Sequence, residues 1–238
     1  YSPDGAFVLT GSGNLDNKVR LWDRKGKLLK EFVTEDNQIK EVVFSPDSRF
    51  VLAGGYRNAA QMWDLNGNQN AMFIGHKGSI YSVSFSPDGQ FVLTGSEDGT
   101  AKLWDLTGKE IRSFSGHKSA VIAAAFFSNG KFILTGSLDH TAKIWEASSG
   151  KELATLVFIG TKDWVVTTPS GLFDATDGAK ALMYYIVDYQ EEKIVVSLDQ
   201  LQERYWQPGL LGAVLGLTNY PIRDVGDFEN LPLFPSIE

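Results

Sequence analysis

Two sets of residues in this chain combine the side chains that a hydrolase uses. Each contains a histidine, a serine and an aspartate, and the sets are His76, Ser96 and Asp98, then His117, Ser137 and Asp139. Such side chains can form a base, a nucleophile and an orienting carboxylate. The two sets are 41 residues apart, and an enzyme seldom repeats its active site along one chain. The repetition therefore favours a structural role over catalysis.

The spacing of the two sets is the period of an internal repeat. Tryptophans recur every 41 residues, at Trp22, Trp63, Trp104 and Trp145. Similar text surrounds them, as in VRLWD, AQMWD, AKLWD and AKIWE, and runs such as FSPDGQFVLTGS lie upstream. A period of this size is typical of repeat architectures, in which each copy is one supersecondary unit.

Each repeat predicts four short antiparallel strands joined by tight turns. In the third repeat, SIYSVSFS and QFVLTGS alternate between two faces, as half-buried strands do. Pro87 and Gly89 suit a turn between them, and Asp98-Gly99 predicts a second hairpin turn. One such sheet cannot bury both faces alone. Stacking the sheets around an axis solves this, which predicts an all-β propeller.

These motifs resemble the WD40 family of β-propellers over about Tyr1 to Phe158. The resemblance implies a WD40-type ring with four clear blades over residues 1–157, the first truncated at its N-terminus. It implies a larger, seven-bladed ring, completed by blades from the same polypeptide or another copy. It also implies a structural hydrogen-bond chain from Trp through Ser or Thr and His to Asp. Its members would be Ser12, Asp16 and Trp22; His76, Ser96, Asp98 and Trp104; and His117, Ser137, Asp139 and Trp145.

The stretch DWVVTTPSGLFDATDG continues the period in a degenerate form. Pro169 stands two periods after Pro87, and KIVVSL falls where a fourth strand should lie. Residues 158–197 are therefore predicted to form a degenerate fifth blade. The alternative is a helical or mixed cap, because GAKALMYY suits a helix.

The pattern changes again after Ser197. Residues 198–238 predict a helix followed by an extended strap or linker, because Ser197 and Gln200 form a capping box and Pro208-Gly209 ends the helix. The segment from Asp163 to Gly216 resembles the region that follows the repeats in bacterial WD40 proteins with a downstream caspase-like peptidase domain. The His and Cys of that peptidase cannot be placed in this chain. The resemblance implies the repeat and connector part of a longer protein.

Composition limits the remaining functions. The chain has 238 residues, a formal net charge of −7 and no cysteine. We therefore expect no nucleic acid or membrane partner, no thiolate metal site and no cysteine catalysis. We expect no cofactor or metal, because neither a Gly-rich phosphate loop nor a metal-ligand cluster is present. The lack of cysteine suits a cytoplasmic location.

The function predicted on these grounds is a non-catalytic scaffold that binds a protein or peptide. The alternative is the repeat half of a caspase-like protease, and an enzyme in its own right is the third possibility. Contact residues are expected at the start of the inner strands and just before the turn aspartates, where a rigid frame holds variable side chains. These candidates are Gln38, Lys40, Tyr56, Arg57, Ser79, Tyr81 and Glu97.

Overall fold

The computed structural model describes residues 1–13, 16–35, 38–189 and 192–225. It divides into two compact units, Tyr1–Lys151 and Glu152–Glu238, and each is described by itself. The strands of the first unit are β1 (Phe7–Gly11), β2 (Lys18–Asp23), β3 (Leu28–Val33), β4 (Ile39–Phe44), β5 (Phe50–Gly55), β6 (Ala59–Asp64), β7 (Gln69–Ile74), β8 (Ile80–Phe85), β9 (Phe91–Ser96), β10 (Thr100–Asp105), β11 (Glu110–Ser115), β12 (Val121–Phe126), β13 (Phe132–Ser137) and β14 (Thr141–Glu146).

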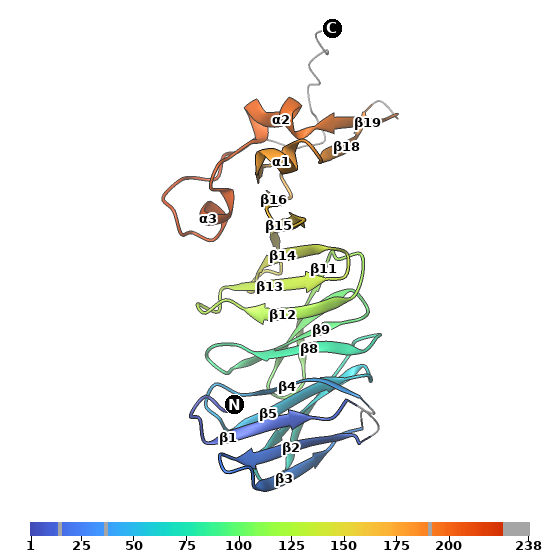
Figure 1. Ribbon diagram of the computed structural model, residues 1–238, viewed down its shortest axis with the longest axis vertical. Coiled ribbons are helices and arrows are strands. Elements are labelled where there is room, and N and C mark those ends of the chain that lie inside the picture. The colour runs from blue at the N-terminus through green and yellow to red at the C-terminus, as the bar shows by residue number, and fades with distance from the viewer. Residues whose placement is uncertain (14–15, 36–37, 190–191, 226–238) are drawn as a thin grey trace. The chain divides into compact units, whose positions relative to one another are not determined.

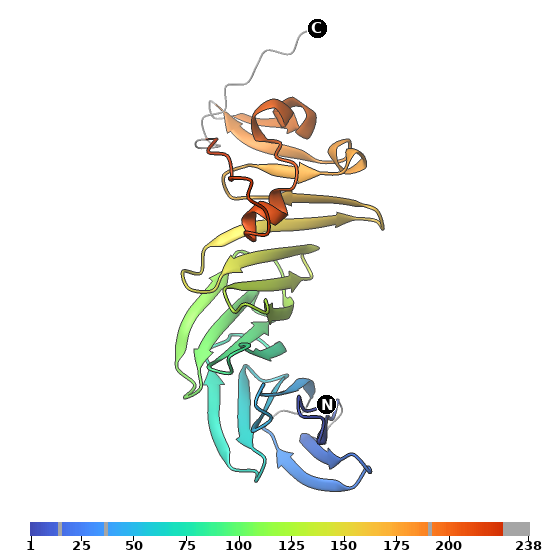
Figure 2. The same ribbon diagram turned by 90° about the vertical axis from the view of Figure 1, so that its left-hand side faces the viewer.

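Within each sheet of the first unit, consecutive strands pair antiparallel, as the repeat predicts. They form the sheets β1-β2-β3, β4-β5-β6-β7 and β8-β9-β10-β11, and β12, β13 and β14 pair in the same order. The sheets follow one another in chain order (Figures 1 and 2). The register repeats too, because each tryptophan of the repeat faces a β-branched residue, as Trp104 faces Val92. The predicted all-β repeat fold is confirmed.

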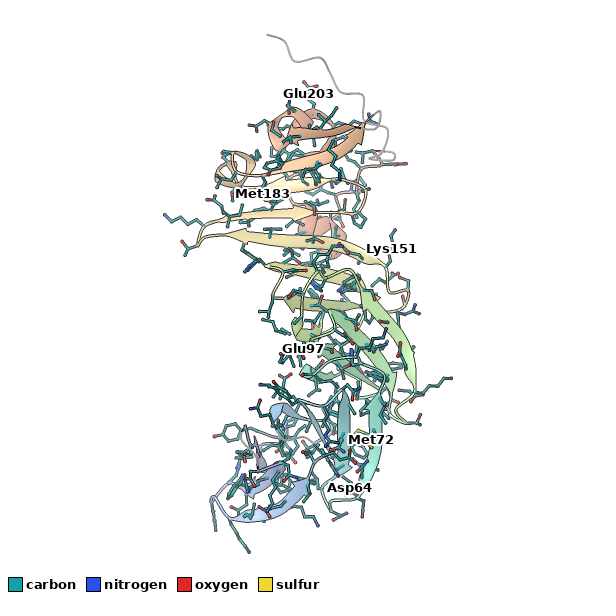
Figure 3. The ribbon with its side chains drawn as sticks, turned by 90° about the vertical axis from the view of Figure 1, so that its right-hand side faces the viewer. Asp64, Met72, Glu97, Lys151, Met183 and Glu203 are labelled. Carbon is teal, nitrogen blue, oxygen red and sulfur yellow. The ribbon has the colours of Figure 1, made fainter. Side chains whose placement is uncertain are left out.

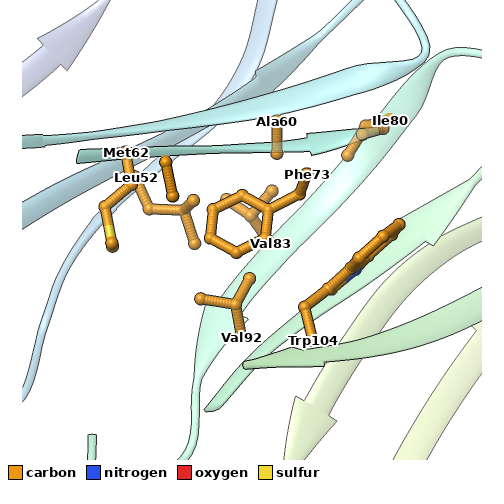
Figure 4. Packing of buried hydrophobic residues seen from close by; sticks show 9 residues of the cluster. Leu52, Ala60, Met62, Phe73, Ile80, Val83, Val92 and Trp104 are labelled. Carbon is orange, nitrogen blue, oxygen red and sulfur yellow. The ribbon is translucent and has the colours of Figure 1, made fainter. Parts of the chain in front are cut away.

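Neighbouring sheets share one apolar core. Figure 4 shows such a cluster, in which Leu52 and Phe73 of one sheet meet Val83, Val92 and Trp104 of the next. Leu52, Phe73, Val92 and Trp104 are fully buried, and Val83 is almost so. The ring of Trp104 meets that of Phe73 edge to face, with centroids 6.0 Å apart. Each sheet therefore reaches its stable packing only with a neighbour beside it.

Glycines in the second strand of a sheet allow this close approach. A Cβ at Gly54 would lie 2.7 Å from side-chain carbons of Ile80 and of Val83, in the next sheet. At Gly95 it would lie 2.9 Å from Cγ1 of Val121. Such distances are shorter than real Cβ contacts, so any larger residue would push the two sheets apart.

We expect Gly95→Ala to lower the free energy of unfolding by about 1–3 kcal/mol, because the added methyl overpacks the contact between the sheets. Gly136→Ala is the matched control, since its Cβ would meet only Ala123 Cβ, at 3.7 Å. That substitution should change stability by less than about 0.5 kcal/mol. Urea unfolding measures both values, and equal losses would contradict the packing argument.

The second unit does not continue the four-stranded pattern. It contains β15 (Glu152–Ile159), β16 (Asp163–Thr167), β17 (Phe173–Ala175), α1 (Asp177–Lys180), β18 (Tyr184–Tyr189), β19 (Glu192–Ser197), α2 (Leu198–Tyr205) and α3 (Leu210–Val214). β15, β16 and β17 pair in that order, whereas β18 and β19 form a separate two-stranded sheet.

The strands expected to make one fifth blade over residues 158–197 thus lie in two sheets. The cause is local, because Thr176 Oγ1 accepts a hydrogen bond from the Ala179 N–H and caps α1. This helix stands between β17 and β18, where the repeats of the first unit have a short hairpin turn. A helical turn at this point removes the pairing of the second and third strands.

The predicted helix after Ser197 is confirmed. Ser197 and Gln200 form the capping box of α2, and Leu198, Leu201 and Tyr205 are its buried residues. The chain after α3 lies against the end of α2, where the Arg223 guanidinium donates to the carbonyl oxygens of residues 204 and 206. Residues 226–238 of the expected strap lie outside the described residues. In the described part of the chain, no helix is both long and apolar enough to cross a bilayer.

Candidate functional site

A directed hydrogen-bond chain crosses the third repeat. Trp104 Nε1–H donates to Thr94 Oγ1 at 2.9 Å, and Thr94 Oγ1 lies 2.7 Å from His76 Nε2. His76 Nδ1 lies 2.9 Å from the Asp98 carboxylate. With a neutral histidine, every donor meets an acceptor: Thr94 donates to Nε2, and Nδ1–H donates to Asp98.

The hydroxyl in this chain belongs to Thr94, which the sequence analysis did not single out. Ser96 Oγ instead donates to the Gly78 carbonyl and accepts the N–H of Asp98. Both nitrogens of His76 are engaged, and neither faces the Ser96 hydroxyl. The geometry of a nucleophile and its base is therefore absent from this set.

The fourth repeat has the same chain, and the first has a fragment of it. Trp145 Nε1 donates to Thr135, whose hydroxyl lies 2.8 Å from His117 Nε2, and His117 Nδ1 lies 2.9 Å from Asp139. Ser137 Oγ bonds backbone groups, as Ser96 does.

In the first repeat, Trp22 Nε1 donates to Thr10 Oγ1 at 2.9 Å, at an exposed position. Asp16 pairs with Arg20 at 2.6 Å, and Ser12 bonds Lys18 and Ile39 through its backbone. The structure therefore brings only the tryptophan of this set into a threonine contact.

Burial and hydrogen bonds set the charges in the third repeat. Burial lowers the pKa of His76 below its usual value, more than the neighbouring Asp98 raises it. Burial would raise the pKa of Asp98, but hydrogen bonds from Thr100, the Lys77 N–H and His76 lower it to about 2. A neutral histidine beside an ionised carboxylate is the stable state near pH 7.

Thr94→Val should lower the free energy of unfolding by about 2–3 kcal/mol, since the Trp104 indole N–H and His76 Nε2 both lose their partner in a buried place. Thr10→Val is the matched control, and water can replace the exposed Thr10 hydroxyl. We expect that control to cost less than about 1 kcal/mol. Equal losses of unfolding free energy in urea would show that the buried hydrogen-bond chain does not add to stability.

The lowered pKa of His76 predicts that the fold loses stability as pH falls from 7 to 5.5. Below its usual pKa of about 6.5 the histidine binds a proton in the unfolded chain but not in the folded one, which favours unfolding. The pKa of Asp98, about 2, keeps that carboxylate charged over this range. The fall in unfolding free energy should be shallower for His76→Gln. Equal slopes in the two proteins would contradict the shifted histidine.

β-Bulges near the start of the inner strands create an exposed surface. In β4 the register shifts between Ile39 and Glu41, which leaves Lys40 as the extra residue. In β8 the same shift leaves Tyr81 between Ile80 and Ser82. A bulge residue turns out of the pleat and re-aims its side chain. The sequence pattern could not show these bulges, although both residues were among its candidates.

The predicted contact residues of the second and third repeats meet at these bulges. Lys40 Nζ lies 5.5 Å from the Tyr56 ring centroid and 5.9 Å from that of Tyr81. Tyr56 is 60% exposed, so its outer face is free for contact. Burial raises the pKa of Tyr81, and the nearby Glu97 adds to this. The set therefore combines a cation with two aromatic rings at one place.

The other candidates support or flank this cluster. Gln38 Oε1 accepts a hydrogen bond from Lys40 Nζ at 3.2 Å. Ser79 is buried, and its hydroxyl donates to Glu97, which follows β9 (Figure 3). Arg57 Nη1 lies 3.5 Å from the Glu35 carboxylate, on an exposed side chain.

The surface extends into the fourth repeat through two residues that sequence reasoning missed. The third bulge, in β12, leaves Ile122 between Val121 and Ala123, and Ile122 is 46% exposed. Leu138 follows β13 and is 55% exposed. Ile122 stands one period after Tyr81, and Leu138 one period after Glu97, so the period could have found them. We call these residues the bulge surface: Lys40, Tyr56, Tyr81, Glu97, Ile122 and Leu138.

Over short stretches the chain is similar to fungal proteins. It is 38% identical over 52 residues to nuclear distribution protein PAC1 of Coccidioides posadasii and 36% identical over 52 residues to that of Fusarium vanettenii. Its identity to nuclear distribution protein nudF 1 of Talaromyces marneffei is 33% over 48 residues. These stretches are 20–22% of this chain, and the chain spans 10–11% of the relatives' length.

The repeat itself matches a family model over most of the first unit. The model is described as WD domain, G-beta repeat, and it matches residues 1–23, 26–64, 67–105 and 108–146. The matched segments make up more than half of the chain, and the sheets of the first unit fit the blades of a β-propeller. The chain belongs to the WD40 repeat family.

Proposed function

We propose that this chain is a non-catalytic scaffold that binds a protein or peptide through the bulge surface. WD40 domains generally mediate protein–protein interactions and are generally non-catalytic scaffolds. The observation that carries the proposal is the row of three bulges at the same register in three successive sheets. The bulges expose side chains on sheets whose own cores are already packed.

The chemistry of the bulge surface suits a peptide laid across the sheets. At one end Lys40 and two tyrosines offer charge and aromatic area, and aromatic residues dominate the energetics of interfaces. At the other end Ile122 and Leu138 offer apolar area. The partner should therefore carry an acidic group at one end and apolar side chains at the other.

The test compares the proteins retained by the chain and by a double variant. Tyr56→Ala with Leu138→Asp removes an aromatic contact and places a charge on the apolar end. We expect the variant to lose the retained partner, with at least about a tenfold drop in affinity once the partner is purified. Affinity purification followed by mass spectrometry identifies the partner, and titration calorimetry measures the affinity.

Ile74→Asp is the matched control, because Ile74 is 63% exposed in β7, which is not part of the bulge surface. It should retain the partner. Thermal unfolding of each variant separates loss of binding from loss of fold. If the double variant binds as tightly as the unchanged chain, the bulge surface is not the binding site.

The second candidate places the same scaffold in a caspase-like protease of a bacterium. The resemblance of residues 163–216 to a connector region supports it, and so does the division of the chain into two compact units. In this proposal residues 1–157 belong to a larger ring, residues 158–197 form a degenerate fifth blade or cap, and residues 198–238 form a helix and a strap or linker. The connector lies within residues 163–216, and the protein works in the cytoplasm. Immunoblotting of the source cells tests it. A natural protein well above the mass of these 238 residues favours it, and an equal mass counts against it.

A further inference from the structure

An unassigned pocket lies between the third and fourth repeats, at the end of their sheets opposite the bulge surface. Its volume is about 590 Å³, within the range of ligand pockets. The turn of the third repeat, from Ser86 to Asp88, forms one wall, and the turn of the fourth repeat, Ser128–Gly130, forms another. Phe91, Leu103 and Phe126 line the interior. The bulge surface uses none of these residues.

At one part of the pocket wall, the fourth repeat lacks a leucine that the two preceding repeats have. Leu65, Leu106 and Ala147 occupy the same position, one period apart. Leu65 and Leu106 each pack against the core beside their own sheet. Ala147 packs at the corresponding place with a much smaller side chain, and it lines the pocket. The alanine therefore leaves more room at this part of the pocket wall than a leucine would.

One wall of the pocket carries an uncompensated positive charge. Arg112 donates to the carbonyl oxygens of Ser148 and Ser149, at 2.6 and 2.7 Å. Its Nε is buried and has no hydrogen-bond partner. Within the described residues, no carboxylate lies at ion-pair distance from this guanidinium. A half-buried arginine that meets only carbonyl dipoles favours an added anion.

A single negative charge stands elsewhere on the pocket wall. Asp88 accepts hydrogen bonds from the Ser86 hydroxyl and the Gln90 N–H, which together lower its pKa. It therefore stays ionised and opposes a second anion near the turn. The pocket accordingly selects a ligand with one carboxylate, placed at Arg112, and an apolar body.

We propose that this pocket binds a peptide segment in which a large apolar side chain stands next to an acidic residue. The apolar side chain fills the space above Ala147, and the carboxylate pairs with Arg112. This partner segment is distinct from the one that binds the bulge surface, so each proposal stands or fails alone.

The test uses two short synthetic peptides and protein labelled with ¹⁵N. One is acetyl-Ser-Gly-Phe-Glu-Gly-Ser-amide, and the other has glutamine in place of glutamate. Amide chemical shifts follow the titrations. We expect shifts at residues 86–91 and 147–149, and about tenfold weaker binding of the glutamine peptide, because a charged hydrogen bond is lost.

Two variants test the two halves of the pocket. Ala147→Leu restores the residue type of the preceding repeats and occupies the place above residue 147 where the apolar side chain binds, so it should abolish binding of both peptides. Arg112→Gln should weaken the glutamate peptide to the level of the glutamine peptide and leave the latter unchanged. If Ala147→Leu does not fold, the Arg112→Gln comparison still decides.

Several results would overturn the proposal. Equal affinity for the two peptides would show that the carboxylate does not contribute to binding. Binding that survives in folded Ala147→Leu would show that the pocket is not the binding site. The absence of chemical shift changes with either peptide, or changes confined to the bulge surface, would also show that the pocket is not the binding site. Free 3-phenylpropanoate that binds as tightly as the peptide would show a small-molecule site instead.

Discussion

The structure of the first unit depends on how closely one sheet approaches the next. A four-stranded sheet has two faces, and each must be covered by a neighbour for the chain to stay folded. Gly54 and Gly95 allow this approach, because a side chain at either position would hold the sheets apart. Glu41 then accepts the Val83 N–H at 2.7 Å, and Ser82 accepts the Ala124 N–H at 3.1 Å, so side chains of each inner strand bond the backbone of the next. The cores around Trp104 and Trp145 form within this spacing.

The sequence predicts the repeat well because the repeat is local. A period of 41 residues, alternating side chains and turn glycines all report on neighbouring residues, and the sheets of the first unit follow them. The sequence leaves two structures open where local signals compete. In the second unit these are a degenerate blade and a helical or mixed cap, and Thr176 caps a helical turn there.

The hydrogen-bond chain shows a finer limit. Thr94 and Ser96 stand on the same face of one strand, and from the sequence either hydroxyl could be the one that bonds the tryptophan and the histidine. Only the threonine reaches the indole and the imidazole, because Ser96 lies nearer to the turn and bonds its backbone. The bulges are a similar case, since one extra residue in a pairing register leaves no mark in composition or alternation.

At the bulges, a residue is released from two requirements that most strand positions must meet, which are packing on the core face and pairing with the neighbouring strand. In an ordinary strand, a change at one residue alters either the packed face or the ladder beside it. At the bulge the extra residue belongs to neither, and the three repeats carry Lys40, Tyr81 and Ile122 there while Ile39, Ile80 and Val121 remain buried. The side chain at the bulge is thus a cation in one repeat, a phenol in the next and an alkyl group in the third, while the pairing of the strands stays the same. At such positions the side chain can change in size and charge while the packed face beneath it stays the same.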